Sequence, residues 1–158
     1  MSGKAAAPGG KRIAQNRKAR RDYHLERPFE VGIRLTGTEV KSLRAGRANI
    51  NDAYAVERGG EVYLLNAHIS QYDGAGPFNH DPLRPRKLLL HKREIRKLVG
   101  ALRRGGVTLV PLTLYFNARG IAKLSLAMAS GKRQYDKRQA EKQRDWQRQK
   151  ARLVRERG

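Results

Sequence analysis

The sequence contains no cysteine, which excludes disulfide bonds and thiolate metal sites and suits a reducing compartment. Aromatic residues make up only 6% of the chain, and no stretch is apolar enough to span a lipid bilayer. The first residues, MSGKAAAPGGKR, also lack the apolar segment of a secretory signal. These absences predict a cytoplasmic protein that has no membrane partner.

Acidic residues are scarce as well, and their shortage leaves a large positive charge. The chain has 14 Asp and Glu against 35 Lys and Arg, a formal net charge of +21. Basic residues outnumber acidic ones by 8 to 2 over residues 1–28 and by 11 to 4 over residues 130–158. Because neutralising phosphates releases their condensed counterions, this charge predicts a polyanionic partner.

Residues arranged for catalysis are missing too. The four histidines are scattered, without the spacing of metal ligands. His80 and Asp81 form the only adjacent His–carboxylate pair, and no matching nucleophile accompanies them. No glycine-rich segment is followed by the Lys-Ser or Lys-Thr of a phosphate-binding loop. We therefore expect a protein that is not an enzyme and that uses no cofactor and no metal.

Most aliphatic residues lie between residues 29 and 129, in short alternating runs. These runs predict strands over residues 29–35, 53–56, 61–67 and 107–116, and a last strand through Leu124, Leu126 and Met128. The alternation changes parity at Val110-Pro111, which predicts a β-bulge or a sheet edge. Several short antiparallel strands indicate a mainly β fold, a small oligonucleotide-binding-like barrel with flanking short helices.

Two helices are predicted within the same segment. One is short, with Thr38 as its N-cap and Gly46 at its end. The other is amphipathic, with Ile95 and Leu98 on its apolar face, and it stops before Gly105.

The chain divides into three parts by composition. We predict a flexible arm over residues 1–12, an RNA-binding β-barrel domain over residues 13–129 and a basic tail over residues 130–158. The tail favours helix but has too few apolar residues to bury a stripe. We therefore expect it to be disordered when free and to become helical when phosphates neutralise its Lys and Arg.

A basic segment precedes the first strong strand pattern. It combines cations with an amide and an aromatic ring: Asn16, Arg17, Lys18, Arg20, Arg21 and Tyr23. Cations grip phosphates, while an amide or a ring contacts a base or a ribose. We predict that these residues bind RNA.

Six motifs occur in order along the chain: NRKAR at 16–20, GTEVKSLRAG at 37–46, NIND at 49–52, RKLLL at 86–90, PLTLY at 111–115 and GKRQYDKR at 131–138. Together they closely resemble the small protein B (SmpB) family, the SsrA-binding proteins of bacteria. The resemblance covers roughly residues 11–155. Arg21 and Ser130 stand where His and Lys are frequent in the family, which affects local contacts only.

The resemblance implies a function on the ribosome. Family members fold as an oligonucleotide-binding-like barrel and bind the tRNA-like domain of transfer-messenger RNA. With elongation factor Tu they deliver this RNA to stalled ribosomes for trans-translation, which rescues the ribosome and tags the peptide. Their tail lies as a helix in the empty mRNA channel and reaches the decoding centre. We expect this chain to do the same as a monomer that binds no DNA.

In the barrel, the resemblance implies that Asn16, Glu30 and Leu89 hold the tRNA-like domain. Read alone, Asn16 can contact a base edge or cap a helix. Glu30 can accept a hydrogen bond from a base or pair with Arg34 or Lys41, which is the commoner arrangement. Leu89 would be a core residue by composition. Six cations are predicted phosphate contacts, although a solvated surface has the same composition: Lys41, Arg44, Arg47, Arg84, Arg86 and Lys87.

In the tail, two groups match the basic signatures of the family: Gly131, Lys132 and Arg133, and then Asp136, Lys137 and Arg138. Tyr135 stands where family members carry an aromatic residue or His that stacks on a nucleotide of the decoding centre. Trp146 is predicted to be a second stacking group or a partner contact. Leu153 and Val154 match an apolar pair near the end of the tail. Without the resemblance, a constitutive ribosomal or initiation-type protein with the same kind of barrel remains an alternative.

Overall fold

A computed structural model describes residues 10–157 of the chain, apart from the side chains of residues 132–139, 141 and 155–157. Its strands are β1 (Lys11–Gln15), β2 (Tyr23–Leu25), β3 (Phe29–Ile33), β4 (Ala48–Asn49), β5 (Tyr54–Arg58), β6 (Glu61–Leu65), β7 (His68–Ile69), β8 (Arg86–Leu89), β9 (Thr108–Phe116) and β10 (Ala122–Gly131). Its helices are α1 (Ala19–Asp22), α2 (Gly37–Arg44), α3 (Lys92–Arg103) and α4 (Lys132–Arg157), with a short 3₁₀ turn at Gly76–Phe78.

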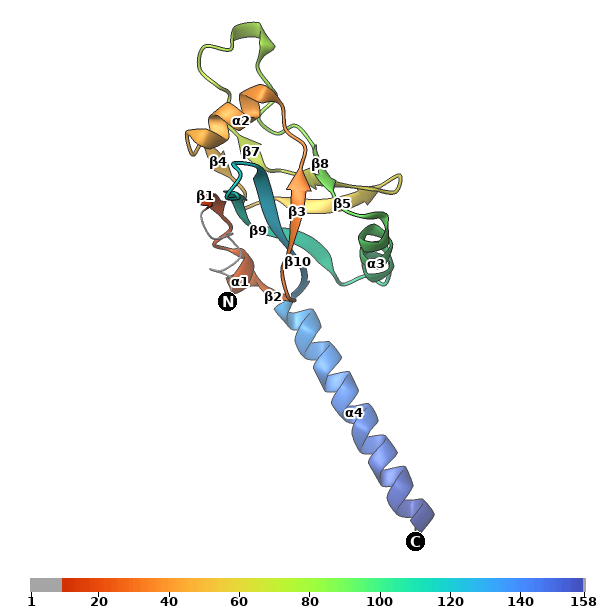
Figure 1. The fold of residues 1–158 in the computed structure, drawn as a ribbon. Coiled ribbons are helices and arrows are strands. Elements are labelled where there is room, and N and C mark those ends of the chain that lie inside the picture. Colours follow the sequence, from red (N-terminus) through yellow and green to blue (C-terminus); the bar gives the residue numbers. More distant parts are fainter. Residues whose placement is uncertain (1–9, 158) are drawn as a thin grey trace.

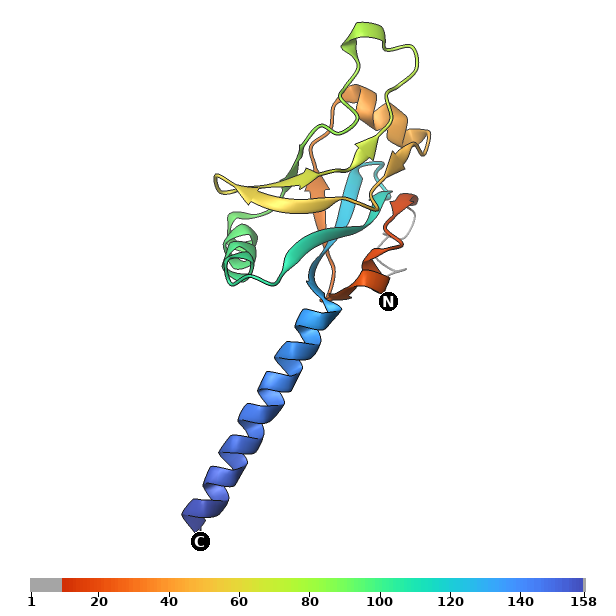
Figure 2. The same cartoon turned by 180° about the vertical axis from the view of Figure 1, so that it is seen from behind.

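The strands form a closed antiparallel barrel (Figures 1 and 2). The sheet order is β1-β9-β5-β6-β8-β3-β10-β2, and an additional pairing of β9 with β10 closes six of these strands into a ring. Val31, Leu88 and Leu124 are among the buried residues that fill its interior. The predicted mainly β, oligonucleotide-binding-like fold is confirmed. Gly59 and Gly60, both with positive φ, turn the hairpin between β5 and β6.

The predicted bulge is present in β9. Ser125 of β10 pairs with Thr113, but the next residue, Leu126, pairs with Pro111, so Leu112 is the extra residue of β9. The bulge changes which side chains face inward, as the parity change in the sequence predicts. At the bulge, the carbonyl groups of Pro111 and Leu112 both accept hydrogen bonds from Asn16, which lies in another segment.

The amino-terminal segment contributes more structure than the sequence predicts. β1 begins at Lys11, inside the predicted flexible arm, and pairs with β9. At the other boundary, β10 continues past residue 129, so that Gly131 pairs with Tyr23 of β2. A second, smaller apolar cluster unites α1, β2 and the outer side of β9 and β10. Three of its five buried residues are alanines, Ala19, Ala127 and Ala129, which give no strong apolar signal in the sequence.

The two short helices are close to their predicted positions, with one correction. The N-cap of α2 is Thr36 and not Thr38, because only Thr36 stands three residues before Glu39 and forms a capping box with it. Thr38 lies within α2, where its hydroxyl group is 2.9 Å from Nδ1 of the buried His80. α3 is amphipathic as predicted, with Ile95 and Leu98 buried.

The tail forms one helix, α4, which points away from the barrel at the end opposite α2 (Figures 1 and 2). Its helical tendency agrees with the sequence, whereas its dependence on the ribosome stays a prediction. No helix among the described residues has both the length and the apolar character needed to cross a bilayer.

Candidate nucleic-acid interface

The outer side of the barrel brings together residues from three strands. Gly32 of β3 pairs with Leu89 of β8 on one side and with Lys123 of β10 on the other. Their sequence neighbours Val31, Leu88 and Leu124 point into the core, so Leu89 and Lys123 point outward. Glu30, two residues before Gly32, shares this side. We call Glu30, Gly32, Leu89 and Lys123 the strand face.

Leu89 is exposed, although a leucine is most often a core residue. The side chain is 51% exposed, which corrects the expectation from composition and agrees with the role implied by the family resemblance. It lies against Gly32, where an added Cβ atom would stand 3.1 Å from the Cβ atom of Leu89. The missing side chain at Gly32 therefore leaves the space that Leu89 occupies.

Glu30 is held in place by a buried tyrosine on the same outer side of the barrel. The hydroxyl group of Tyr115 in β9 donates a short hydrogen bond to Oε2 of Glu30. Tyr115 has no exposed surface, and burial together with this carboxylate raises the pKa of its hydroxyl group. The partner of Glu30 is thus neither Arg34 nor Lys41, the two cations that the sequence suggests. The contact fixes the position of a negative charge on a basic surface.

Asn16 has a structural role in this fold. The residue is buried, and its Oδ1 accepts a hydrogen bond of 3.2 Å from the backbone N–H of Ala19. Its Nδ2 donates to the carbonyl group of Pro111 at 3.0 Å, and its backbone N–H donates to Leu112 at 2.8 Å. Both carbonyl groups belong to the bulge of β9. Asn16 therefore caps the turn into α1 and attaches this turn to the barrel. Of the two roles that the sequence allows, base contact or helix capping, the structure shows capping.

The basic segment after Asn16 is exposed around this anchor. Arg17, Lys18, Arg20 and Arg21 are exposed and Tyr23 is half-buried. Lys18 pairs with Asp52 at 3.2 Å, an exposed contact that contributes little stability and is easily exchanged for a phosphate.

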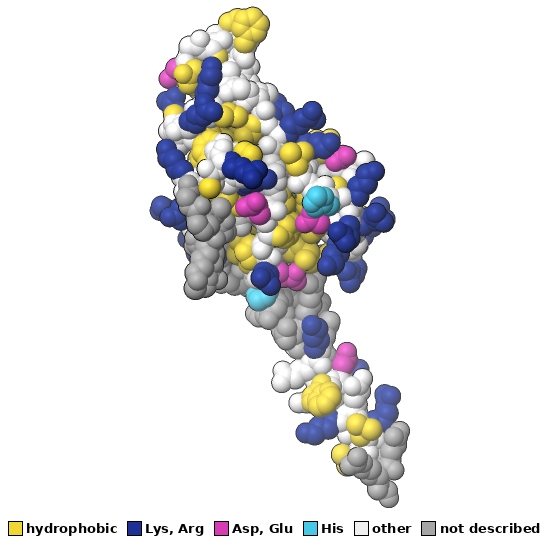
Figure 3. All heavy atoms as spheres, viewed as in Figure 1, with side chains coloured by type: hydrophobic (Ala, Val, Ile, Leu, Met, Phe, Trp, Pro, Cys, Tyr) yellow, Lys and Arg dark blue, Asp and Glu magenta, His cyan; other side chains and the backbone are white. Residues whose placement is uncertain are grey.

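The cations of α2 and of the residues just after it are exposed in the same way. The ammonium group of Lys41 lies 5.4 Å from the centre of the Tyr72 ring, and Arg47 pairs with Asp73 at 3.2 Å. Arg44 is also exposed. Figure 3 shows Lys and Arg side chains spread over the visible side of the barrel, with few acidic groups among them.

Arg86 is a correction to the predicted RNA contacts. Its side chain is fully buried, and its Nε donates to Oε2 of Glu39 at 2.6 Å and its Nη1 to the carbonyl group of Ala67 at 2.6 Å. Arg84, which is partly exposed, donates to the other oxygen of Glu39 at 2.6 Å. This ion cluster of Glu39, Arg84 and Arg86 joins α2 to β8, so Arg86 is not available to RNA.

The ion cluster holds Glu39 in its charged form. Burial alone would raise the pKa of this carboxyl group, but hydrogen bonds from Arg84, Thr36 and Arg86 outweigh burial and lower it. Lys87, the cation that follows Arg86 in the sequence, is partly exposed and pairs with Glu61 at 3.5 Å. Of the three cations, Lys87 is the one that the structure leaves at the surface with an exchangeable partner.

The tail presents three apolar side chains to solvent. Trp146 is 61% exposed, Leu153 58% and Val154 67%, and their contact with a partner stays a prediction. Gly131 is the last residue of β10. The side chains of the other predicted tail residues lie outside the described part: Lys132, Arg133, Tyr135, Asp136, Lys137 and Arg138.

Comparison with known proteins decides the family. A family model described as SmpB protein matches residues 13–156. The chain belongs to the SmpB family. Relatives named SsrA-binding protein are 60% identical in Rhodopseudomonas palustris (strain HaA2), over 92% of this chain and 93% of the relative, and 56% identical in Afipia carboxidovorans, over the full length of both.

A solved SmpB structure is similar as well. A chain described under "tmRNA-SmpB: a journey to the center of the bacterial ribosome" is 51% identical, with a TM-score of 0.63. The match covers 75% of this chain and 82% of that one. The resemblance to the SmpB family that the sequence motifs indicate is therefore confirmed.

Three residues of this candidate interface carry no recognisable signal in the sequence. Lys123 looks like any other surface cation until the register places it beside Gly32 and Tyr115. Gly32 and Tyr115 are parts of strand patterns, and their relation to Leu89 and Glu30 depends on pairing between distant segments. Among the side chains that the structure describes, no three His, Asp or Glu form a group that could hold a metal ion.

Proposed function

We propose that this chain binds the tRNA-like domain of transfer-messenger RNA through its barrel, as an RNA-binding protein and not as an enzyme. The observation that carries the proposal is the strand face, where an exposed leucine, a lysine and an anchored carboxylate lie together on the barrel of an SmpB-family chain. The names of its relatives and the subject of the similar solved structure support the same RNA.

The tail supplies a second RNA surface in this proposal. The barrel, together with elongation factor Tu on the aminoacylated RNA, carries transfer-messenger RNA to a stalled ribosome for trans-translation. There α4 enters the empty mRNA channel and reaches the decoding centre with Lys132, Arg133 and Tyr135, followed by Lys137 and Arg138. One copy of the chain acts on one RNA, as a monomer in the cytoplasm.

Sequencing the RNA that co-purifies with the full-length protein tests the proposal. We expect one abundant small RNA with a tRNA-like end, bound by the purified protein in a filter assay. Stoichiometric recovery with ribosomal subunits at all stages of translation, without that RNA, would instead identify a constitutive ribosomal protein and contradict the proposal.

A further inference from the structure

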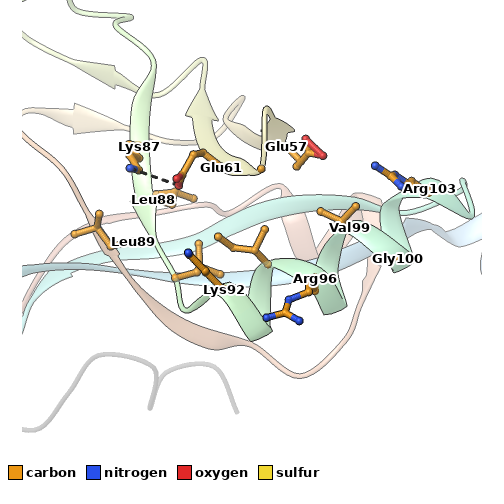
Figure 4. Close-up of a pocket in the computed structure, with 13 residues that line it drawn as sticks. Glu57, Glu61, Lys87, Leu88, Leu89, Lys92, Arg96, Val99, Gly100 and Arg103 are labelled. Carbon is orange, nitrogen blue, oxygen red and sulfur yellow. Dashed lines mark ion pairs between the residues drawn. The ribbon is translucent and has the colours of Figure 1, made fainter.

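A groove runs beside the strand face, between α3 and the turn end of the β5–β6 hairpin (Figure 4). Its volume is about 770 Å³, enough for a group of nucleotide size. Leu88, Ile95 and Val99 give it an apolar floor. Leu89 of the strand face lines one end of it, so the two surfaces are continuous.

The cations of α3 and its C-cap Arg104 divide into two rows, and only one row faces this groove. Lys92, Arg96 and Arg103 line the groove, whereas Arg93, Lys97 and Arg104 do not. At 3.6 residues per turn, the first three lie within about 40° of each other and the second three are centred about 100° further around the helix. All six are exposed. We call the first three the groove row and the second three the outer row.

The groove row has no ion pair among the described residues. The groove contains two acidic residues, Glu57 and Glu61, and Glu61 is engaged by Lys87 at 3.5 Å. Four cations therefore face two carboxylates, and the excess charge lies along α3. Rising 1.5 Å per residue, α3 places Lys92 and Arg96 about 6 Å apart along its axis and Arg103 about 10 Å beyond.

We propose that this groove binds a stretch of RNA backbone, with the groove row on the phosphates and Leu89 against a ribose or base. A row of unpaired cations beside an apolar floor suits a chain of phosphates whose sugars and bases are partly apolar. Because Leu89 belongs to both surfaces, the occupant is the tRNA-like domain, held on the strand face and continuing along α3. This inference rests on the proposed function and adds α3 to the RNA-binding surface.

Two variants that lose the same charge distinguish specific binding in the groove from a general effect of positive charge on affinity. One carries Lys92→Gln, Arg96→Gln and Arg103→Gln, and the other carries Arg93→Gln, Lys97→Gln and Arg104→Gln. Each loses three exposed cations from the same helix. In filter binding to the tRNA-like domain, the groove-row variant should lose about tenfold in affinity. Measured at several salt concentrations, the slope of the logarithm of its binding constant against the logarithm of the salt concentration should be shallower by about two to three, at roughly one per phosphate contact. The outer-row variant should lose about twofold.

Equal losses in the two variants, or no loss in either, would overturn the inference. Failure of the unaltered protein to bind this RNA would instead overturn the proposed function. Circular dichroism melting checks that both variants fold.

A second measurement does not depend on removing the whole row. Because the chain has no cysteine, Arg96→Cys and Lys97→Cys each give a single attachment site for an iron chelate that cleaves nearby RNA. Arg96→Cys should cleave one continuous run of the bound tRNA-like domain, and Lys97→Cys should cleave it several-fold less. Absence of cleavage from position 96 in a complex that still forms would overturn the inference.

Discussion

The buried hydroxyl group of Tyr115 fixes the position of a surface residue, Glu30, before RNA binds. It holds the Glu30 carboxylate on the outer side of the barrel, so that Glu30 meets RNA in one position and loses little side-chain entropy on binding. Tyr115→Phe removes this contact and keeps the ring. We expect RNA affinity to fall about three- to tenfold, with a change of about 1 kcal/mol or less in the free energy of unfolding. Filter binding and urea denaturation measure the two effects.

A double-mutant comparison distinguishes positioning from packing at Tyr115. In a Glu30→Ala background the hydroxyl group has no carboxylate to hold, so Tyr115→Phe should cause no further loss of affinity. If the same additional loss occurs in both backgrounds, Tyr115 does not act through Glu30.

Asn16 should behave differently from Glu30 when it is replaced. Asn16→Ala removes two side-chain hydrogen bonds and leaves a buried carbonyl group of Pro111 without this donor. We expect a loss of about 1–3 kcal/mol in the free energy of unfolding, since a buried group is left unsatisfied. The matched variant Arg17→Ala, at an exposed neighbour, should leave stability unchanged within about 0.5 kcal/mol. Equal stability of both variants would contradict the structural role of Asn16.

At the scale of elements, the ion cluster attaches α2 to β8 and should make this attachment sensitive to acid. The pKa of Glu39 is lowered from 4.5 in the folded chain. A carboxyl group with a lowered pKa stabilises the fold above its unfolded pKa and loses this contribution as the pH falls through the folded value. We therefore expect the free energy of unfolding to decrease below about pH 4.5, measured by urea denaturation at a series of pH values.

Glu39→Gln should flatten this part of the pH profile and should also destabilise the fold at neutral pH by about 3–5 kcal/mol, because Arg86 keeps a buried charge without its partner. Glu61→Gln provides the matched control. It breaks the more exposed pair with Lys87 and should cost less than about 1 kcal/mol. A Glu39→Gln profile that parallels the unaltered protein would assign the acid sensitivity to other groups.

The same elements show what a sequence can and cannot predict. Strands with alternating apolar residues and the parity change at Pro111 are predictable, because period and turn chemistry are local properties. The burial of Arg86 and the exposure of Leu89 are not predictable in this way. The local sequence around an arginine does not distinguish a buried position from a surface position, and the RKLLL motif does not indicate which leucine faces outward. The Lys123–Gly32–Leu89 row depends on strand register, which emerges only when distant segments pair.

At the scale of the whole molecule, barrel and tail should be separable. The tail boundary lies at residue 132, because Ser130 is buried and Gly131 pairs with β2. A chain ending at Gly131 should keep its melting temperature and most of its affinity for the tRNA-like domain, yet lose peptide tagging on ribosomes stalled at a truncated message. An in vitro tagging assay measures this.

Trp146→Ala gives a finer test of the tail, because it removes the largest exposed ring and leaves the helix in place. We expect reduced tagging with unchanged RNA affinity. Normal tagging by the chain that ends at Gly131 would contradict a tail that works on the ribosome.

The direct junction between β10 and α4 has a geometric consequence. No loop separates the two elements, so the direction of the helix follows from the last strand of the barrel. A helix of 26 residues is about 39 Å long at 1.5 Å per residue. When α4 is formed, the end of the tail therefore lies at a set distance from the barrel, and a partner can engage both only if its own two docking points are separated to match.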